Sequence, residues 1–268
     1  MRKISYPLVK NFTYQLHKTL NRSFWAVADF IFPPHSLLSD EIVKIDGTIE
    51  FEEWQKLHFH FGAQCNICAT PLTDAHGHDD VCAICLNEPP DYDKARAPLL
   101  YDEYSKQLVL QLKHSGRKDG VKTFAKMMHE CFNWDDIDLI FPMPLHPRRL
   151  FERGFNQSAW LANEISKLAK KPWRHDILIR IKNTKSQNGL SIKGRMRNMR
   201  GAFKVKTDIK GKNICIVDDV FTTGSSVNSC AKALKKAGAN KIYVLTLLRV
   251  GRPKTIEDFE MEILNVAL

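Results

Sequence analysis

The sequence lacks any long hydrophobic run. No stretch of about 18 uncharged apolar residues occurs in it, which argues against a transmembrane helix. Residues 1–12 (MRKISYPLVKNF) contain no continuous apolar segment of the kind that a secretory leader needs. Seven cysteines in a chain without such a leader indicate a reducing compartment. We therefore expect a cytoplasmic protein with no stable membrane insertion.

One N-terminal segment could still contact a membrane surface. Apolar residues recur at helical spacing between Phe12 and Phe32, and charged residues such as Lys18, Arg22 and Asp29 lie among them. We favour a helix packed on its own domain over a membrane-surface helix.

Acidic residues are scarce in the C-terminal part of the chain. Residues 1–100 carry 9 Lys and Arg against 13 Asp and Glu, whereas residues 101–268 carry 31 against 17. The formal net charge of +10 is therefore concentrated after residue 100. A polyanionic ligand is expected to meet that part of the protein.

The hydrophobic pattern divides the chain into four regions. Residues 1–60 are helical and then loop-like, residues 61–93 bear cysteines, residues 94–250 alternate strands with amphipathic helices, and residues 251–268 form a tail. Alternation of this kind predicts an α/β fold with a parallel sheet flanked by helices. The expected strands are 95–101, 139–145, 202–205, 213–219 and 242–250, and the expected helices are 104–113, 121–131, 156–169 and 226–237, the last closed by Gly238.

Two Cys-x-x-Cys pairs predict a metal site. Four thiolates in tetrahedral array suit zinc, and a closed set of four sulfur ligands indicates a structural ion. Free thiols or a disulfide are the less favoured alternatives. His76 and His78 lie between the pairs and are expected to be exposed turn residues, and Cys131, Cys215 and Cys230 are expected in the core. The proposed ligands are Cys65, Cys68, Cys82 and Cys85.

The segment ICIVDDVFTTGSS predicts a ligand site at a strand end. An apolar strand delivers Asp218 and Asp219 to its carboxyl edge, where open parallel sheets bind ligands. In the turn that follows, Gly224 lets backbone N–H groups converge at a helix start, which favours a monophosphate. Because carboxylates repel phosphate, the two aspartates must serve hydroxyls, a metal or a developing cation of the same ligand. Their alternative role is to cap the turn and helix.

This segment resembles the 5-phosphoribosyl-1-pyrophosphate (PRPP) binding motif of type I phosphoribosyltransferases. Together with the cysteine pairs, LVLQLKHSGRKD (108–119), PMPLHPRRLFERGFNQSAWLA (142–162) and NTKSQNGLSIKGRMRNMRGAF (183–203), it is similar to the ComF family of competence proteins. The resemblance covers residues from about 32 to 250. It implies a type I phosphoribosyltransferase-like sheet preceded by a small helical segment and a zinc-ribbon-like unit.

The resemblance also assigns roles to individual residues. Asp218 and Asp219, the candidate catalytic acids, would contact the ribose hydroxyls of PRPP bound with Mg²⁺. Residues 142–149 would form a loop facing the pyrophosphate, and Thr184 and Asn198 would belong to a loop that closes over it. The 5-phosphate would be bound by Thr222, Thr223, Gly224, Ser225 and Ser226, and the pyrophosphate and its loop would involve Lys113, Arg148, Arg149, Arg153, Gln187 and Arg195.

The family often carries two zinc knuckles, and this sequence departs from that pattern. A second pair of x-x-spaced positions holds Ser36, Ser39, Glu50 and Glu53 in place of cysteines. Serine and glutamate would not hold zinc there, so we predict one structural zinc, not two.

The basic segment 180–206 has a rival use in binding nucleic acid. It contains nine cations and no acid, which suits a phosphate backbone, but it has few aromatic residues to stack on bases. A solvated loop is the plain alternative.

Two functions therefore remain open. The first is a competence protein that binds PRPP or a related phosphorylated ribose and handles single-stranded DNA with other competence proteins. The second is a metabolic, Mg²⁺-dependent phosphoribosyltransferase. Residues 251–268 contain no recognisable base-binding pattern, so catalysis and its acceptor do not follow from the PRPP motif.

Overall fold

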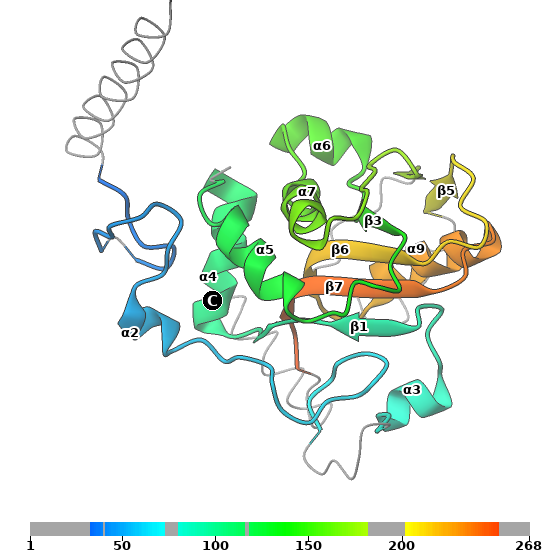
Figure 1. Ribbon diagram of the computed structural model, residues 1–268, viewed down its shortest axis with the longest axis horizontal. Helices are drawn as coiled ribbons and strands as arrows, with labels where there is room; N and C mark the ends of the chain where they lie inside the picture. Colours follow the sequence, from blue (N-terminus) through cyan, green and yellow to red (C-terminus); the bar gives the residue numbers. More distant parts are fainter. Residues whose placement is uncertain (1–32, 40, 73–79, 116–117, 182–201, 252–268) are drawn as a thin grey trace, which may run out of the picture.

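The computed structural model of the protein describes residues 33–39, 41–72, 80–115, 118–181 and 202–251 (Figure 1). In this part of the chain a parallel β-sheet carries helices on both faces, which confirms the predicted fold. The expected helix between Phe12 and Phe32 and the tail after residue 251 lie outside the described residues. None of the helices that the structure describes is both long enough and apolar enough to span a membrane.

The sheet has the strand order β1-β7-β6-β3, and each of these pairs is parallel. The four strands are β1 (Lys94–Arg96), β3 (Leu139–Pro142), β6 (Ile214–Phe221) and β7 (Ile242–Arg249). β3, β6 and β7 correspond to strands expected from the sequence, with ends that differ by at most three residues, and β1 covers the first part of the strand expected over 95–101.

The edge strand is interrupted. β1 pairs with β7 up to Arg96, and β2 (Leu99–Leu100) resumes the pairing in the same register, with Leu99 opposite Leu248. The break includes Pro98, which has no N–H to donate. The single strand expected over 95–101 is therefore two short pieces of one edge strand.

The central strands are apolar on both faces because both faces are covered. Ile214 and Ile216 of β6 pack in one core cluster, and Cys215 and Val217 pack in the other. A continuous apolar run is typical of a parallel strand covered on both sides. Cys215 and Cys230 are fully buried as expected, and Cys131 is partly buried.

Helices cover the two faces separately. α5 (Val121–His129) and α7 (Gln157–Ala169) contribute to the cluster that contains Cys215, and α9 (Ser225–Lys236) contributes to the cluster that contains Ile214. α9 ends before Gly238, whose φ of +93° is the left-handed conformation predicted for this helix end.

The helix expected at 104–113 has two parts. α4 (Glu103–Leu110) begins with a capping box formed by Asp102 and Ser105, and the chain continues as a π-helical turn, η1 (Gln111–Ser115). The sequence pattern predicted one uninterrupted helix here. A π turn differs from an α-helical turn only in which backbone carbonyl each N–H donates to, so the residue types do not reveal it.

Part of the expected loop 142–149 is helical. α6 (Pro147–Arg153) begins at a proline in its first turn and ends at Gly154, which has a φ of +79°. Proline at the start and glycine after the end of a helix are recognised boundary signals, so this helix was predictable.

A small antiparallel pair lies beside the main sheet. The expected strand near 202–205 is β5 (Phe203–Val205), and it pairs with β4 (Leu178–Arg180), which the sequence did not predict. In Figure 1 both β5 and α6 lie near the top of the view, above the sheet.

The cysteine-bearing region packs directly on the sheet. Cys65, Cys68 and Cys85 belong to the same core cluster as Ile214, and the Ala95 N–H of β1 donates to the Ile67 carbonyl at 2.7 Å. This region contains α3 (Ala83–Asn87), and the preceding region contains the short α2 (Phe51–Trp54). This cysteine-bearing region, the cysteine unit, therefore shares its core with β6, the strand that carries Asp218 and Asp219.

Candidate functional site

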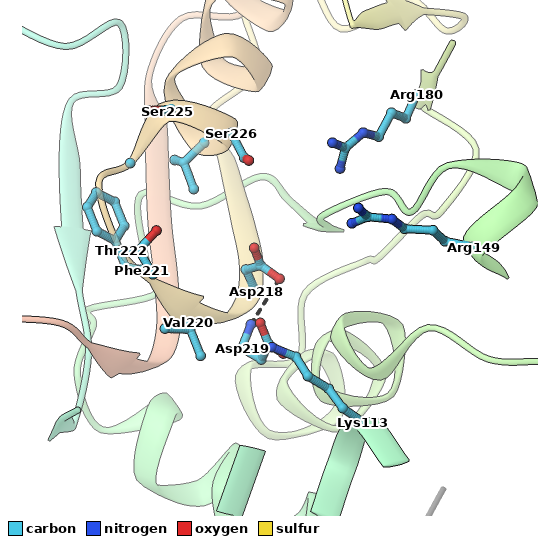
Figure 2. Close-up of a pocket in the computed structure, with 12 residues that line it drawn as sticks. Lys113, Arg149, Arg180, Asp218, Asp219, Val220, Phe221, Thr222, Ser225 and Ser226 are labelled. Carbon is cyan, nitrogen blue, oxygen red and sulfur yellow. Dashed lines mark hydrogen bonds and ion pairs between the residues drawn. The ribbon is translucent and has the colours of Figure 1, made fainter. Parts of the chain in front are cut away.

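A pocket of about 250 Å³ lies at the carboxyl end of β6 (Figure 2). This is the edge at which open parallel sheets bind ligands. The carboxylates, the following turn and three cations meet here, although they come from distant parts of the sequence. The lining residues are Lys113, Arg149, Arg180, Asp218, Asp219, Val220, Phe221, Thr222, Gly224, Ser225, Ser226 and Val227.

The first turn of α7 holds the two carboxylates. Ser158 Oγ donates to Asp218 Oδ1 at 2.8 Å, and Gln157 Nε2 donates to Asp219 Oδ2 at 3.1 Å. Asn156 caps this helix by accepting from the Ser158 N–H, as expected for the segment that opens it. A helix N-terminus favours negative charge, so the fold itself compensates part of the acid repulsion.

Asp218 titrates far from its ordinary range. Burial, followed by the charge of Asp219, raises the pKa of Asp218 from 3.8 to about 7, while the hydrogen bond from Ser158 opposes the rise. A carboxyl group with a pKa near 7 can exchange a proton near neutral pH. Its ionised form can accept a hydrogen bond from a ligand hydroxyl.

The turn after β6 has the conformation that anion binding requires. Gly224 adopts a φ of +74°, and α9 starts at Ser225 immediately after it. Thr223 and Ser225 hydroxyls lie 2.9 Å apart, so each can be a donor or an acceptor. The first N–H groups of a helix have no partner within the helix, so they can donate to a phosphate. Thr222, Gly224, Ser225 and Ser226 line the pocket, and Thr223 is not among the lining residues.

Cations occupy the opposite side of the pocket. In Figure 2 the guanidinium groups of Arg149 and Arg180 point into it across from the turn, and Lys113 approaches from below. Lys113 Nζ lies 2.8 Å from Asp219 Oδ2. Burial, followed by the charge of Arg149, lowers the pKa of Arg180, although Asp218 opposes this. Two arginines facing the same space favour an anionic group between them.

The other two arginines of the expected pyrophosphate loop do not line this pocket. Arg148 Nε donates to Glu152 at 2.8 Å on the exposed side of α6, and Arg153 Nη1 donates to Gln157 Oε1 at 2.8 Å. Only Arg149 of the three is among the lining residues. Arg153 is nevertheless one contact away from the site, since Gln157 also holds Asp219.

Sequence reasoning missed three residues of this site. Arg180 was counted only as one of nine loop cations, and Ser158 and Gln157 were seen only as part of a helix start. A signal did exist for the last two, because polar residues in the first turn of a helix that follows a strand face the same sheet edge as Asp218.

The remaining loop predictions cannot be placed. Thr184, Gln187, Arg195 and Asn198 lie outside the described residues, as do His76 and His78.

The four predicted metal ligands come together. The Sγ atoms of Cys65, Cys68, Cys82 and Cys85 all lie within 4.8 Å of one another, and those of Cys68 and Cys82 are 3.7 Å apart. Tetrahedral zinc with bonds of roughly 2.3 Å places sulfur atoms roughly 3.8 Å apart, so the residues present fit this ion.

Hydrogen bonds to sulfur support the same assignment. Cys65 Sγ accepts from the backbone N–H groups of Cys68 and Cys82 at 3.5 and 3.3 Å, and the Thr70 hydroxyl lies 3.1 Å from Cys68 Sγ. The hydrogen bond between the two sulfurs lowers the pKa of Cys68 and raises the pKa of Cys65, and Thr70 lowers that of Cys68 further. Zinc binds the thiolate form, and of these two residues Cys68 is the one that reaches it first.

The positions of the second knuckle are joined by hydrogen bonds. Ser36 Oγ donates to a carboxylate oxygen of Glu53 and accepts from the Glu50 N–H at 3.1 Å, and Ser39 Oγ accepts from the Glu41 N–H at 3.1 Å. Ser36 and Glu53, two of the four positions that resemble a metal-ligand pattern, are thus in direct contact through a hydroxyl and a carboxylate.

Comparisons with known proteins agree with these observations. The family model "Phosphoribosyl transferase domain" matches residues 156–263. The chain is 31% identical over 192 residues to "DNA utilization protein YhgH" of Escherichia coli strain K12, covering 69% of this chain and 83% of that protein. It is 31% identical over 195 residues to "Competence protein F" of Haemophilus influenzae, covering 69% and 84%. It is 25% identical over 216 residues to "Competence protein ComFC" of Bacillus subtilis, covering 78% and 87%.

Proposed function

Because this chain belongs to the competence protein F (ComF) family, with a phosphoribosyltransferase-type fold, we propose that it binds PRPP or a related phosphorylated ribose. We propose further that it handles single-stranded DNA in the cytoplasm during natural transformation. The ligand part of this proposal rests on the pocket, and the DNA part rests on α6 and on the relatives.

One observation carries the ligand proposal, namely the order of charges across the pocket. The anion-binding turn is at one end, Asp218 and Asp219 lie in the middle with Lys113 paired to Asp219, and Arg149 and Arg180 lie on the far side. PRPP offers matching groups, a 5-phosphate, a ribose diol and a pyrophosphate. The turn would bind the phosphate, the acids would accept from the hydroxyls, and the cations would neutralise the pyrophosphate.

Magnesium fits this arrangement as part of the ligand. Asp218 and Asp219 supply the hard oxygen ligands that Mg²⁺ prefers, directly or through water. When bound, the ion would neutralise pyrophosphate charge. The chain's own contribution is to hold both carboxylates through Ser158 and Gln157, and to keep part of the acid charge compensated by Lys113.

The surface of α6 supports the DNA part of the proposal. Phe151 is 90% exposed on this helix, and Arg148 of the same helix has a side chain that is 70% exposed. Exposed aromatic rings stack on bases, and arginines bind the backbone of a single strand. We expected a loop over residues 142–149, so the placement of Phe151 and Arg148 on one helix comes from the structure. Single-stranded DNA at this surface would lie next to the pocket to which Arg149 belongs.

Calorimetry with Mg²⁺ and PRPP tests the ligand proposal. The double variant Asp218→Asn with Asp219→Asn should weaken binding by about 100-fold or more, because hydrogen bonds to charged acceptors contribute about 1.5 to 3 kcal/mol each. Asp176→Asn, which alters an exposed acid paired with Arg174, is the matched control. Equal PRPP affinity in the wild type and the double variant would contradict the ligand proposal.

Fluorescence anisotropy with a short labelled single strand tests the DNA proposal. Phe151→Ala should weaken binding about 10-fold or more, because stacking of one base contributes about 1 to 3 kcal/mol. Leu168→Ala, which removes a partly exposed apolar side chain from α7, is the control. Unchanged DNA affinity in Phe151→Ala would contradict the role of α6, and normal transformation by a deletion strain would contradict the cellular role.

A metabolic phosphoribosyltransferase is the second candidate, and the pKa of Asp218 near 7 favours it. In such a transfer the bond from ribose C1 to pyrophosphate breaks, a bond from C1 to the acceptor forms, and the acceptor's proton must go to a base. A group that titrates near the working pH suits that proton transfer. Release of pyrophosphate from PRPP with a base or amine, measured on purified protein, would establish this activity.

A further inference from the structure

The last residue of β7 is a buried arginine. Arg249 is only 1% exposed, and it is the largest fully buried side chain among the described residues. Burying a guanidinium is costly unless its donors are satisfied, so its contacts indicate what it is for.

One side of the Arg249 guanidinium donates hydrogen bonds to the cysteine unit. Its Nε donates to the Cys68 carbonyl at 2.9 Å, and its Nη2 donates to Thr70 Oγ1 at 2.8 Å. The same Thr70 oxygen lies 3.1 Å from Cys68 Sγ. A metal ligand and the residue that hydrogen-bonds to its sulfur are therefore both attached to this guanidinium.

The other side of Arg249 contacts the turn after β6, residues 222–226, which we call the phosphate turn. Its Nη1 donates to the carbonyls of Phe221 at 3.3 Å and Thr222 at 3.0 Å. Its guanidinium carbon lies 4.4 Å from the centre of the Phe221 ring. That ring in turn supports Gly224, because a Cβ added to Gly224 would come within 2.7 Å of it.

These contacts connect two sites that are far apart in sequence. Cys68 lies 181 residues before Arg249, and Thr222 lies 27 residues before it. A guanidinium presents its donors in a rigid planar fork, so its partners on both sides must keep their relative positions. Loss of the metal would free Cys68 and Thr70 to move, and the carbonyls of the turn would lose a fixed partner.

We propose that Arg249 is a positioning residue that couples metal binding by the cysteine unit to the geometry of the phosphate turn. By linkage, a phosphate ligand bound at the turn strengthens metal binding by the same factor by which metal strengthens ligand binding. The inference takes the identity of the ligand from the proposed function, but the coupling itself does not depend on that identity.

The test uses the full-length, zinc-loaded protein and three variants. Arg249→Lys keeps the charge and removes the planar fork, and Thr70→Val removes the hydroxyl that links Arg249 to Cys68 Sγ. Arg96→Lys is the matched control, because Arg96 also anchors the cysteine unit, through the Asn66 carbonyl at 3.1 Å and its side-chain oxygen at 2.9 Å. Both of those contacts come from β1, and neither involves a residue of the phosphate turn.

Hydrogen–deuterium exchange of peptides that cover residues 221–228 is the first measurement. In the wild type, removing zinc should accelerate exchange there by about 10-fold, a coupling of ordinary size for linked sites. Arg249→Lys should show the faster exchange with zinc still bound, Thr70→Val should show part of it, and Arg96→Lys should match the wild type. Peptides from α7 serve as the internal reference for global unfolding.

Binding of ribose 5-phosphate and retention of zinc form the second measurement. Zinc removal should weaken ribose 5-phosphate binding to the wild type about 10-fold, and the ligand should raise zinc affinity, measured at equilibrium against a competing chelator, to a matching extent. Both effects should disappear in Arg249→Lys.

The outcomes separate the coupling from the proposed function. Three results would each overturn the coupling. They are unchanged exchange at residues 221–228 in zinc-loaded Arg249→Lys, equally fast exchange there in Arg96→Lys, and a matching acceleration in the α7 peptides. If Arg249→Lys does not fold, unchanged exchange in Thr70→Val overturns it instead. A wild type that binds neither PRPP nor ribose 5-phosphate contradicts the proposed function, while the exchange data still decide the coupling.

Discussion

Ser158 Oγ donates a hydrogen bond of 2.8 Å to Asp218 Oδ1, across 60 residues of sequence. The bond opposes the rise in pKa that burial and Asp219 impose on Asp218. The first turn of α7 therefore favours the ionised form of the acid, against the larger effects of burial and Asp219.

Ser158→Ala should raise the pKa of Asp218 further. A lost hydrogen bond of about 1.4 kcal/mol corresponds to about one pH unit, so the pH at which PRPP binding is half-maximal should move up by about one. Calorimetry from pH 6 to 9 measures the change. Ser166→Ala is the control, since Ser166 lies on the same helix and donates only to the Asn163 carbonyl among its described contacts. An identical pH profile in both variants would show that Ser158 does not act through Asp218.

Asp218→Asn should stabilise the protein near neutral pH. The folded-state pKa of about 7 lies above the ordinary value of 3.8, so the contribution of Asp218 to stability is complete below pH 4 and is lost as pH rises to 7. Asn removes this charge, which should increase the free energy of unfolding at pH 8 by roughly 1 to 3 kcal/mol and change it little at pH 4. Thermal denaturation at several pH values gives the comparison. A variant that is less stable than the wild type at pH 8 would show that the burial cost of this carboxylate is already offset.

Gly224→Ala should disrupt the phosphate turn. The substitution meets a φ of +74° and places a Cβ 2.7 Å from the Phe221 ring. Gly154→Ala is a matched control, because it has a φ of +79° and no atom within 4 Å of the added Cβ. Both variants should lose about 1 to 2 kcal/mol from backbone strain, and Gly224→Ala should lose more because of the clash. Only Gly224→Ala should lose ribose 5-phosphate binding, and equal binding losses would count against a special role for this turn.

Arg149→Gln should reduce PRPP affinity more than ribose 5-phosphate affinity. Arg149 lines the pocket opposite the turn, where the pyrophosphate is expected, and ribose 5-phosphate has no such group. The loss for PRPP should be about 10-fold to 100-fold, as for other hydrogen bonds to charged groups. Arg148→Gln is the comparison, because Arg148 pairs with Glu152 outside the lining residues. A larger loss in Arg148→Gln would place the pyrophosphate along α6 and not in the pocket.

Metal analysis of the purified protein should find one zinc per chain. Cys65→Ser and Cys82→Ser should each abolish it and lower the melting temperature, because a structural zinc contributes directly to folding. Cys131→Ser should keep it, since the Cys131 thiol contacts the Met127 carbonyl and not the cysteine unit. Two zincs per chain would contradict the interpretation of Ser36 and Glu53 as a metal-free remnant.

Local patterns account for most of what was predicted from the sequence. Cys-x-x-Cys pairs, adjacent aspartates after an apolar run and a glycine before a helix each fall within a few residues, so their geometry follows from the backbone alone. The main strands were predictable for the same reason, because a strand buried on both faces such as β6 must be apolar throughout. The break in the edge strand near Pro98 changed only the boundaries of a predicted strand, whereas α6 and β4 are elements that we did not predict.

The sequence by itself determined the fold class, the phosphate turn, the acid pair and the four cysteines, since these depend on short-range spacing. Only the tertiary structure decided which cations face the acids, which hydroxyl holds Asp218, and that Arg249 joins the cysteine unit to the turn. Those contacts connect residues 27 to 181 positions apart. Their partners are fixed by how the chain packs around one sheet edge, and no local pattern of charges or hydroxyls specifies that packing.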